Sequence, residues 1–171
     1  MIDLVKSPVN GYVCLQDPGE PVWGGKRLSI SDVEGKILAE LSIDKSVLEI
    51  GTGLGVSTTF IAGTARCVYT IDVDPWVKEN VAPSLPKNVH FFKSVDEYGI
   101  MPGFDMAFVD GLHEYEQILK DISNVRRLVK TGGLLLFHDF RLPQVSRALV
   151  VSKINTTSIM TTAGIGVAWN E

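Results

Sequence analysis

Cysteine and long apolar runs are both scarce in this chain of 171 residues, and each scarcity excludes a class of protein. The two cysteines, Cys14 and Cys67, do not have the spacing of a metal site or a redox pair, so we expect free thiols. No segment reaches the roughly 18 apolar residues that a membrane-spanning helix needs, and the N-terminus lacks the apolar core of a secretion signal. These absences predict a soluble, cytoplasmic protein with no membrane partner.

The chain also lacks any concentration of positive charge. Its 16 lysines and arginines are scattered among 20 acidic residues, which gives a formal net charge of -4. A nucleic-acid-binding surface needs clustered Lys and Arg, so we expect no nucleic-acid partner. The length and the 45% hydrophobic content suit one complete core rather than two. We therefore predict one domain over 31–171, preceded by an arm or lid over 1–30 that carries Trp23.

Short apolar runs alternate with segments of helical period, which is typical of a sheet covered by helices on both faces. The segment 31–41 begins with a capping box, Ser31 with Glu34, and a long helix over 114–130 ends at Thr-Gly-Gly. The last two strands are close enough to form an antiparallel hairpin at the sheet edge. The fold class is therefore α/β, with strands expected at 46–50, 67–72, 89–92, 105–110, 133–138, 156–161 and 164–169.

A glycine-rich loop, EIGTGLGVS, follows the first of these strands. A dinucleotide-binding turn has a third glycine where this chain has Val56. Here glycine stands at every second position instead, at Gly51, Gly53 and Gly55, after Glu49. Such a loop brings bare backbone against an uncharged or cationic group, such as the amino-acid and ribose parts of S-adenosylmethionine. The alternative is a tight turn between strand and helix with no ligand.

An acidic residue at the end of the second strand supports a ligand. Asp72 lies where a doubly wound sheet places a carboxylate beside the first strand, and it could accept hydrogen bonds from both ribose hydroxyls. Asp74, just before Pro75, is better explained as a helix cap. Asp72 as a plain exposed acid is the alternative, but loop and acid together favour an adenosyl cofactor.

Four motifs, EIGTGLG, YTID, FVDGLHEY and GGLLLFHDF, give the chain a family resemblance. It resembles class I S-adenosylmethionine-dependent methyltransferases, in particular the small bacterial branch of catechol-type and macrocin-type O-methyltransferases, from residue 31 to about 169. The resemblance implies a Rossmann-like sheet of order 3-2-1-4-5-7-6 with strand 7 antiparallel. Where the family usually has Gly-Asp-Ser, this chain reads Ser-Val-Asp, so Asp96 is only a candidate for the adenine edge. The implied cofactor-binding residues are Glu49, Gly51, Gly53, Gly55, Asp72, Asp96 and Asp110.

The chemistry is expected where strands four and five end, because ligands of open α/β sheets bind there. Asp110 and His113 follow one strand, and His138 and Asp139 follow its neighbour. In metal-dependent relatives, the positions of Asp110, His138 and Asp139 hold the cation, commonly with a carboxylate in place of His138. Mg or Mn is therefore implied, whereas the imidazole leaves a different metal, or none, as alternatives.

Methyl transfer to a hydroxyl needs a group that removes the hydroxyl proton. The family has a lysine or histidine base at the position of His113, so the resemblance implies that His113 is catalytic; a helix-capping loop histidine is the alternative. We predict S-adenosylmethionine-dependent methylation of a small-molecule hydroxyl, with the acceptor unidentified and, by analogy of fold, a homodimer. The alternatives are an NAD(P)-type nucleotide-binding oxidoreductase and a non-catalytic adenosyl-binding module.

Overall fold

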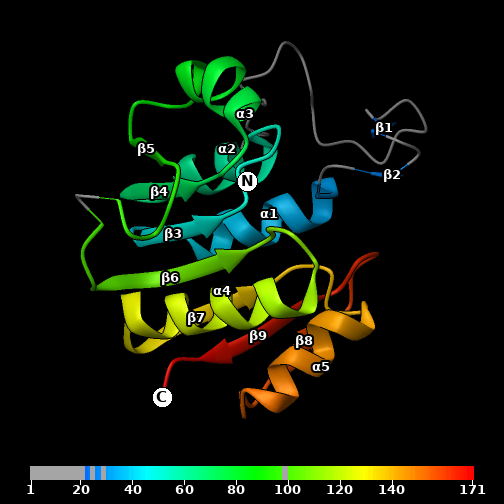
Figure 1. Cartoon of the computed structure of the whole chain (residues 1–171). Coiled ribbons are helices and arrows are strands. Elements are labelled where there is room, and N and C mark those ends of the chain that lie inside the picture. The colour runs from blue at the N-terminus through cyan, green and yellow to red at the C-terminus, as the bar shows by residue number, and fades with distance from the viewer. Residues whose placement is uncertain (1–21, 24–25, 28–29, 98–99) are drawn as a thin grey trace.

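A single seven-stranded sheet organises the chain (Figure 1). The computed structural model describes residues 22–23, 26–27, 30–97 and 100–171. The strand order is β5-β4-β3-β6-β7-β9-β8, and only β9 runs antiparallel to its neighbours. This confirms the predicted order and the antiparallel hairpin. The strands are β3 (Ser46–Ile50), β4 (Cys67–Ile71), β5 (Val89–Phe92), β6 (Phe104–Val109), β7 (Val129–Phe137), β8 (Thr157–Ile159) and β9 (Ile165–Trp169).

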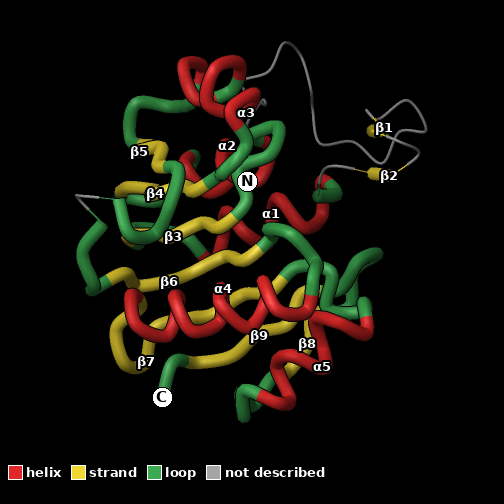
Figure 2. Tube along the Cα trace, in the orientation of Figure 1, coloured by secondary structure: helices red, strands yellow, loops and turns green. Residues whose placement is uncertain are grey.

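Helices cover both faces of the sheet, as Figure 2 shows. On one face α1 (Asp32–Leu41) packs beside α2 (Val56–Ala62), and on the other α4 (Tyr115–Leu128) packs beside α5 (Pro143–Val151). Strand side chains alternate between the two faces. In β3, Leu48 packs in the core under α4 and α5, whereas Val47 packs in the core under α1 and α2. The sequence is therefore apolar on both sides of each central strand. The remaining helices are α3 (Pro75–Asn80) and the 3-10 turn η1 (Ala82–Ser84).

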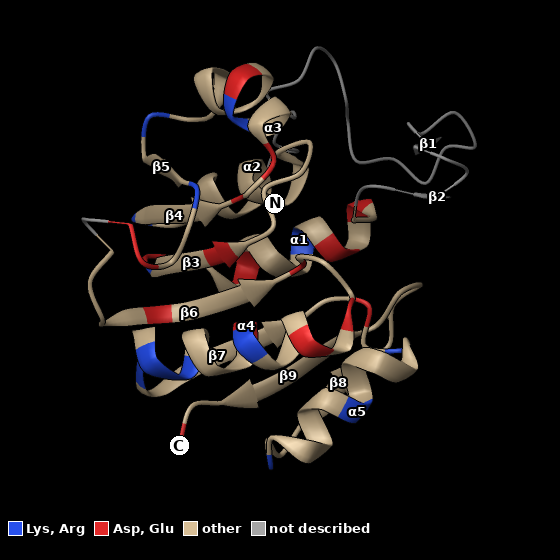
Figure 3. Cartoon of the chain, viewed as in Figure 1, with Lys and Arg blue, Asp and Glu red and all other residues tan. Residues whose placement is uncertain are grey.

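Helix starts follow the predicted capping chemistry. The capping box of α1 is formed, because Ser31 Oγ accepts the N–H of Glu34 at 3.3 Å and Glu34 Oε2 accepts the N–H of Ser31 at 2.7 Å. Asp74 caps α3 by accepting the N–H of Trp76 at 2.8 Å. The first turn of α4 contains the acidic Glu116 and its last turn the basic Arg126 and Arg127, which complements the helix dipole; Figure 3 colours these charges along the ribbon.

The Thr-Gly-Gly segment was wrongly predicted to end a helix. The helix α4 ends at Leu128, two residues before the predicted end, and both glycines lie within β7. Val129 already has extended backbone angles and pairs with Phe104 of β6, after which the register shifts. Gly132, with φ of +76°, accommodates this irregularity in the strand. The glycines therefore lie in an irregular part of the strand and do not end a helix.

The N-terminal region is described only in part. Within it, β1 (Val22–Trp23) pairs antiparallel with β2 (Lys26–Arg27). The predicted arm over 1–30, the side chain of Trp23 and Cys14 otherwise lie outside the described residues. Cys67 is a free thiol. No helix within the described ranges has the length and apolar character needed to cross a membrane.

Candidate active site

The glycine-rich loop and the end of β6 are in direct contact. Gly51 follows β3 with φ of +96°, a left-handed conformation that favours glycine. A Cβ atom at this position would lie 2.1 Å from the carbonyl oxygen of Asp110, which is far inside van der Waals contact. Gly51 is therefore required by the close approach of two strand ends, and this approach places the loop beside the predicted catalytic residues.

The outer part of the loop is open. Gly53 has φ of +50°, and no described atom outside its chain neighbours lies within 4 Å of where its Cβ would be. Asp72 fixes this conformation, because its Oδ2 accepts the N–H groups of Thr52 at 3.1 Å and Gly53 at 2.9 Å. Gly55, with φ of +75°, is the N-cap of α2. The loop is thus a rigid turn with exposed backbone, onto which a ligand can pack closely.

Glu49 lies beneath this loop and not on its ligand-facing side. Its carboxylate is fully buried and accepts hydrogen bonds from the hydroxyls of Ser57, Thr58 and Thr70 at 2.5–2.6 Å. Burial raises the pKa of Glu49 to about 7, against the opposing effect of the three hydroxyls. The expected direct contact between Glu49 and a cofactor is corrected by this burial: the residue supports the loop by tying β3 to α2.

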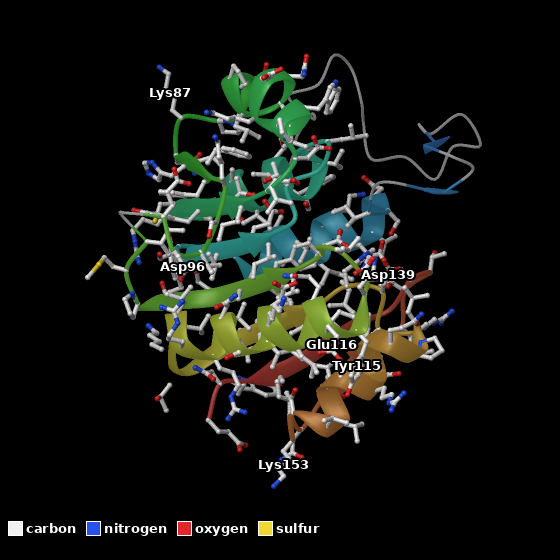
Figure 4. All side chains as sticks on the ribbon, viewed as in Figure 1. Lys87, Asp96, Tyr115, Glu116, Asp139 and Lys153 are labelled. Carbon is white, nitrogen blue, oxygen red and sulfur yellow. The ribbon has the colours of Figure 1, made fainter. Side chains whose placement is uncertain are left out.

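Asp96 lies on a different side of the molecule from Asp139 in the view of Figure 4. Its side chain is 84% exposed, and its Oδ1 lies 3.7 Å from Arg127, in the last turn of α4. Figure 4 shows Asp96 and Asp139 on opposite sides of the view, with Tyr115, the first residue of α4, on the side of Asp139. The loop that follows β5 therefore places Asp96 beside the C-terminal end of α4, and its contact with the adenine edge stays a prediction.

Three side chains converge where β6 and β7 end. His113 Nε2 lies 3.1 Å from Asp139 Oδ2 and 3.8 Å from Asp110 Oδ1. One ligand atom from each of the three residues lies within 4.8 Å of the others. Asp139 has φ of +52°, an uncommon conformation for a residue other than glycine and one that recurs at functional sites. This cluster brings together the predicted base and two of the three predicted metal ligands.

The third predicted metal ligand, His138, is surrounded by carboxylates. Its Nδ1 lies 3.0 Å from Asp110 Oδ1 and 3.4 Å from Asp139 Oδ2, and its Nε2 lies 3.5 Å from Glu34 Oε2. Burial opposes protonation of this ring, but the charge and hydrogen bond of Asp110, together with the other two acids, raise the pKa of His138 to about 12. An imidazolium has no lone pair for a metal. A metal-ligand role for His138 would therefore require the ring to give up a proton, and that role stays a prediction.

Glu34 also belongs to this network, although no sequence pattern indicated that it would. The side chain is 1% exposed, and its Oε1 accepts the hydroxyl of Thr161, in the turn between β8 and β9, at 2.5 Å. Burial raises the pKa of Glu34, but the hydrogen bonds from His138, Thr161 and Ser31 outweigh it and hold the pKa well below its usual range. The capping box had identified Glu34, but only as a local feature of α1.

Comparison with known proteins identifies a family. Residues 48–140 match a family model described as a methyltransferase domain. The chain is also similar to the uncharacterized protein R132 of Acanthamoeba polyphaga mimivirus, with 28% identity in an alignment of 129 positions that covers 62% of this chain. It spans 58% of the length of that curated relative. The matched segment contains the glycine-rich loop and the whole cluster of Asp110, His113, His138 and Asp139.

Solved structures share the fold. The O-methyltransferase TomG from Streptomyces achromogenes, solved with S-adenosylmethionine, has a TM-score of 0.68 and 22% identity, covering 83% of this chain and 81% of TomG. An O-methyltransferase from Bacillus cereus, solved with S-adenosylhomocysteine, has a TM-score of 0.70 and 18% identity, covering 85% of this chain and 84% of its own. At these identities the likeness establishes the fold alone.

Proposed function

The chain belongs to the methyltransferase domain family, and from this membership we propose that it transfers a methyl group from S-adenosylmethionine to a hydroxyl of a small molecule. The observation that carries the proposal is the contact between Gly51 and the backbone of Asp110. Through this contact, the loop suited to the cofactor lies beside the one cluster of His and Asp side chains that the described part of the chain offers for proton transfer.

The cofactor is assigned to the loop after β3. The open space at Gly53 suits the close packing of an uncharged or cationic group on the backbone, and both O-methyltransferases compared above were solved with an adenosyl ligand. Asp72 stands beside this space with one oxygen committed to the loop and the other accepting the N–H of Asp74. Each carboxylate oxygen has two acceptor sites, so Asp72 retains capacity for ribose hydroxyls.

His113 is proposed as the base. Its Nε2 faces Asp139 at 3.1 Å, an arrangement that favours a proton on Nε2 and leaves Nδ1 as the proton acceptor. In the reaction the bond between sulfur and methyl carbon breaks as the bond between methyl carbon and acceptor oxygen forms. The hydroxyl proton passes to Nδ1, so the products are S-adenosylhomocysteine, a methyl ether and a protonated His113. Alignment of donor and acceptor supplies the rest of the catalysis, because the sulfonium is already activated.

A divalent cation fits the same cluster, although not the ligand set expected from sequence. The residues that would hold it are Asp110 and Asp139, with His113 as a third ligand only in place of its role as base. Three carboxylates lie within 3.5 Å of His138, and a divalent cation would offset part of this concentration of acidic groups. Mg and Mn accept carboxylate oxygens, and Mn also accepts imidazole. When bound, such a cation would lower the pKa of the acceptor hydroxyl.

Calorimetric titration with S-adenosylhomocysteine tests the proposal, in EDTA and then in Mg²⁺ or Mn²⁺, with NADH as a control. We expect micromolar binding of S-adenosylhomocysteine and none of NADH. Gly53→Leu should abolish binding by filling the open space, whereas Gly132→Leu, also at positive φ with no neighbour within 4 Å, should not. Absence of binding to the unaltered protein would reject the methyltransferase function. Binding without turnover across a panel of hydroxylated acceptors would favour the non-catalytic module.

A further inference from the structure

Glu34 is a buried carboxylate that the reaction proposed above does not use. It lies in the first turn of α1, 104 positions before His138 in the chain, yet its Oε2 lies 3.5 Å from His138 Nε2. Within the described residues, Glu34 takes part in one ion pair, and its partner is His138. An acid that is 1% exposed requires such a cation, because burying an unpaired charge is costly.

The capping box does not by itself explain this burial. A glutamate at the third position of a helix needs only to accept the N–H of the capping residue, and a glutamine does the same. Glu34 accepts two further groups, the hydroxyl of Ser31 at 2.8 Å and that of Thr161 at 2.5 Å. With His138, these contacts place its charge at the junction of α1, β7 and the turn that follows β8. The negative charge, and not only the acceptor capacity, has a partner there.

We propose that Glu34 is a positioning residue that acts through His138 on the two carboxylates of the reaction site. The proposal rests on the function proposed above, because it concerns the residues assigned to proton transfer. The ring of His138 is held from both sides, by Glu34 at Nε2 and by Asp110 and Asp139 at Nδ1. The ring therefore lies between Glu34 and the two carboxylates, and its position links the one to the others.

The carboxylate arrangement determines where His113 points. Asp139 Oδ2 lies 3.4 Å from His138 Nδ1 and 3.1 Å from His113 Nε2, so one oxygen is shared between the two rings. If the His138 ring loses its partner at Nε2, only the contacts at Nδ1 orient it, and this shared oxygen is less tightly positioned. The orientation of His113 therefore depends on Glu34, a residue that it does not contact.

The test compares Glu34→Gln with Ser31→Ala. The first removes the charge and keeps an acceptor for the cap, whereas the second weakens the cap and keeps the pair with His138. We expect E34Q to lower kcat about tenfold with an unchanged KM for S-adenosylmethionine, since the loss of a partner that orients a site residue commonly costs 10-fold to 100-fold. S31A should lower the melting temperature and leave kcat within twofold of the unaltered protein.

A measurement without turnover separates this inference from the proposed function. The chain has three histidines, so ¹⁵N-histidine labelling gives an assignable spectrum of ring nitrogens. We expect the His113 resonances to shift in E34Q and to stay in place in S31A, whether or not an acceptor has been found. If E34Q does not fold, Glu34→Asp replaces it, because its carboxylate is one methylene too short to reach His138. Unchanged His113 resonances together with unchanged kcat would overturn the positioning role.

Discussion

Charged residues gather on two sides of the sheet: the amino edge, where the parallel strands begin, and the carboxyl edge, where they end. The two groups differ in their balance of acidic and basic side chains. At the amino edge, Asp105 is paired with Arg66 at 3.2 Å and with Lys130, and it accepts the N–H of Ser46 at 2.8 Å. These cations are more than half exposed. At the carboxyl edge, three carboxylates share the imidazoles of two histidines in a partly buried cluster.

This difference distinguishes a stabilising ion pair from a site suited to chemistry. The exposed pairs of Asp105 contribute little, because solvent screens them and long side chains lose entropy when held. At the carboxyl edge, burial makes each unmatched charge expensive and therefore available to bind a cation or to move a proton. In these two described clusters, cations outnumber the carboxylate where strands begin, and carboxylates outnumber the histidines where strands end.

The largest expected effect is a loss of activity from a substitution at the carboxyl edge alone. His113→Ala should lower kcat about a thousandfold, because removal of a general base typically costs 10²-fold to 10⁴-fold. The fold should persist, since His113 is partly exposed. Lys130→Ala, the matched change at the amino edge, should leave kcat unchanged and cost less than about 1 kcal/mol of stability. Initial rates and urea unfolding measure both, and an H113A variant with more than a tenth of the original kcat would contradict the base assignment.

The next effect compares a glycine at each edge. Gly51→Ala should cost about 4 kcal/mol, because the new Cβ combines left-handed strain with an overlap on the Asp110 carbonyl. Gly132→Ala has the same kind of φ but no neighbour within 4 Å, so we expect about 1 kcal/mol. Chemical denaturation gives both values. Equal losses of stability in the two variants would show that the close approach of β3 and β6 does not require glycine at position 51.

The smallest effect concerns the pH dependence of two acids. Burial raises the pKa of Glu49 from 4.5 to about 7, so its contribution is complete below pH 4.5 and is lost as pH rises through 7, by about 3 kcal/mol. The pKa of Asp105 is lowered by its hydrogen bond with Lys130, so its contribution is present above pH 3.8 and lost in acid. Urea unfolding between pH 5 and 9 should show a decline that Glu49→Gln removes. Parallel curves for the two proteins would refute the raised pKa.

Much of the fold could be predicted from the sequence, because its determinants are local. The strands β3 and β5 were predicted residue for residue, since apolar runs bounded by turns need no knowledge of distant partners. The sheet order came from the family resemblance and is confirmed. The error at β7 has a tertiary cause, because Thr-Gly-Gly ends a helix in isolation, whereas here both glycines form backbone hydrogen bonds with Asn170, just after β9.

The sequence by itself determined the glycine-rich loop, the capping box and the placement of Asp110, His113, His138 and Asp139 after neighbouring strands, because each depends on residues close in the chain. Only the tertiary structure decided their roles. It buried His138 against Glu34 and left His113 facing Asp139. The reason is that protonation and ligand capacity depend on which charges surround a group, and here those charges come from α1, β6 and β7. Residue types predict where a site lies, but the packing of separate elements determines which group each ring nitrogen contacts.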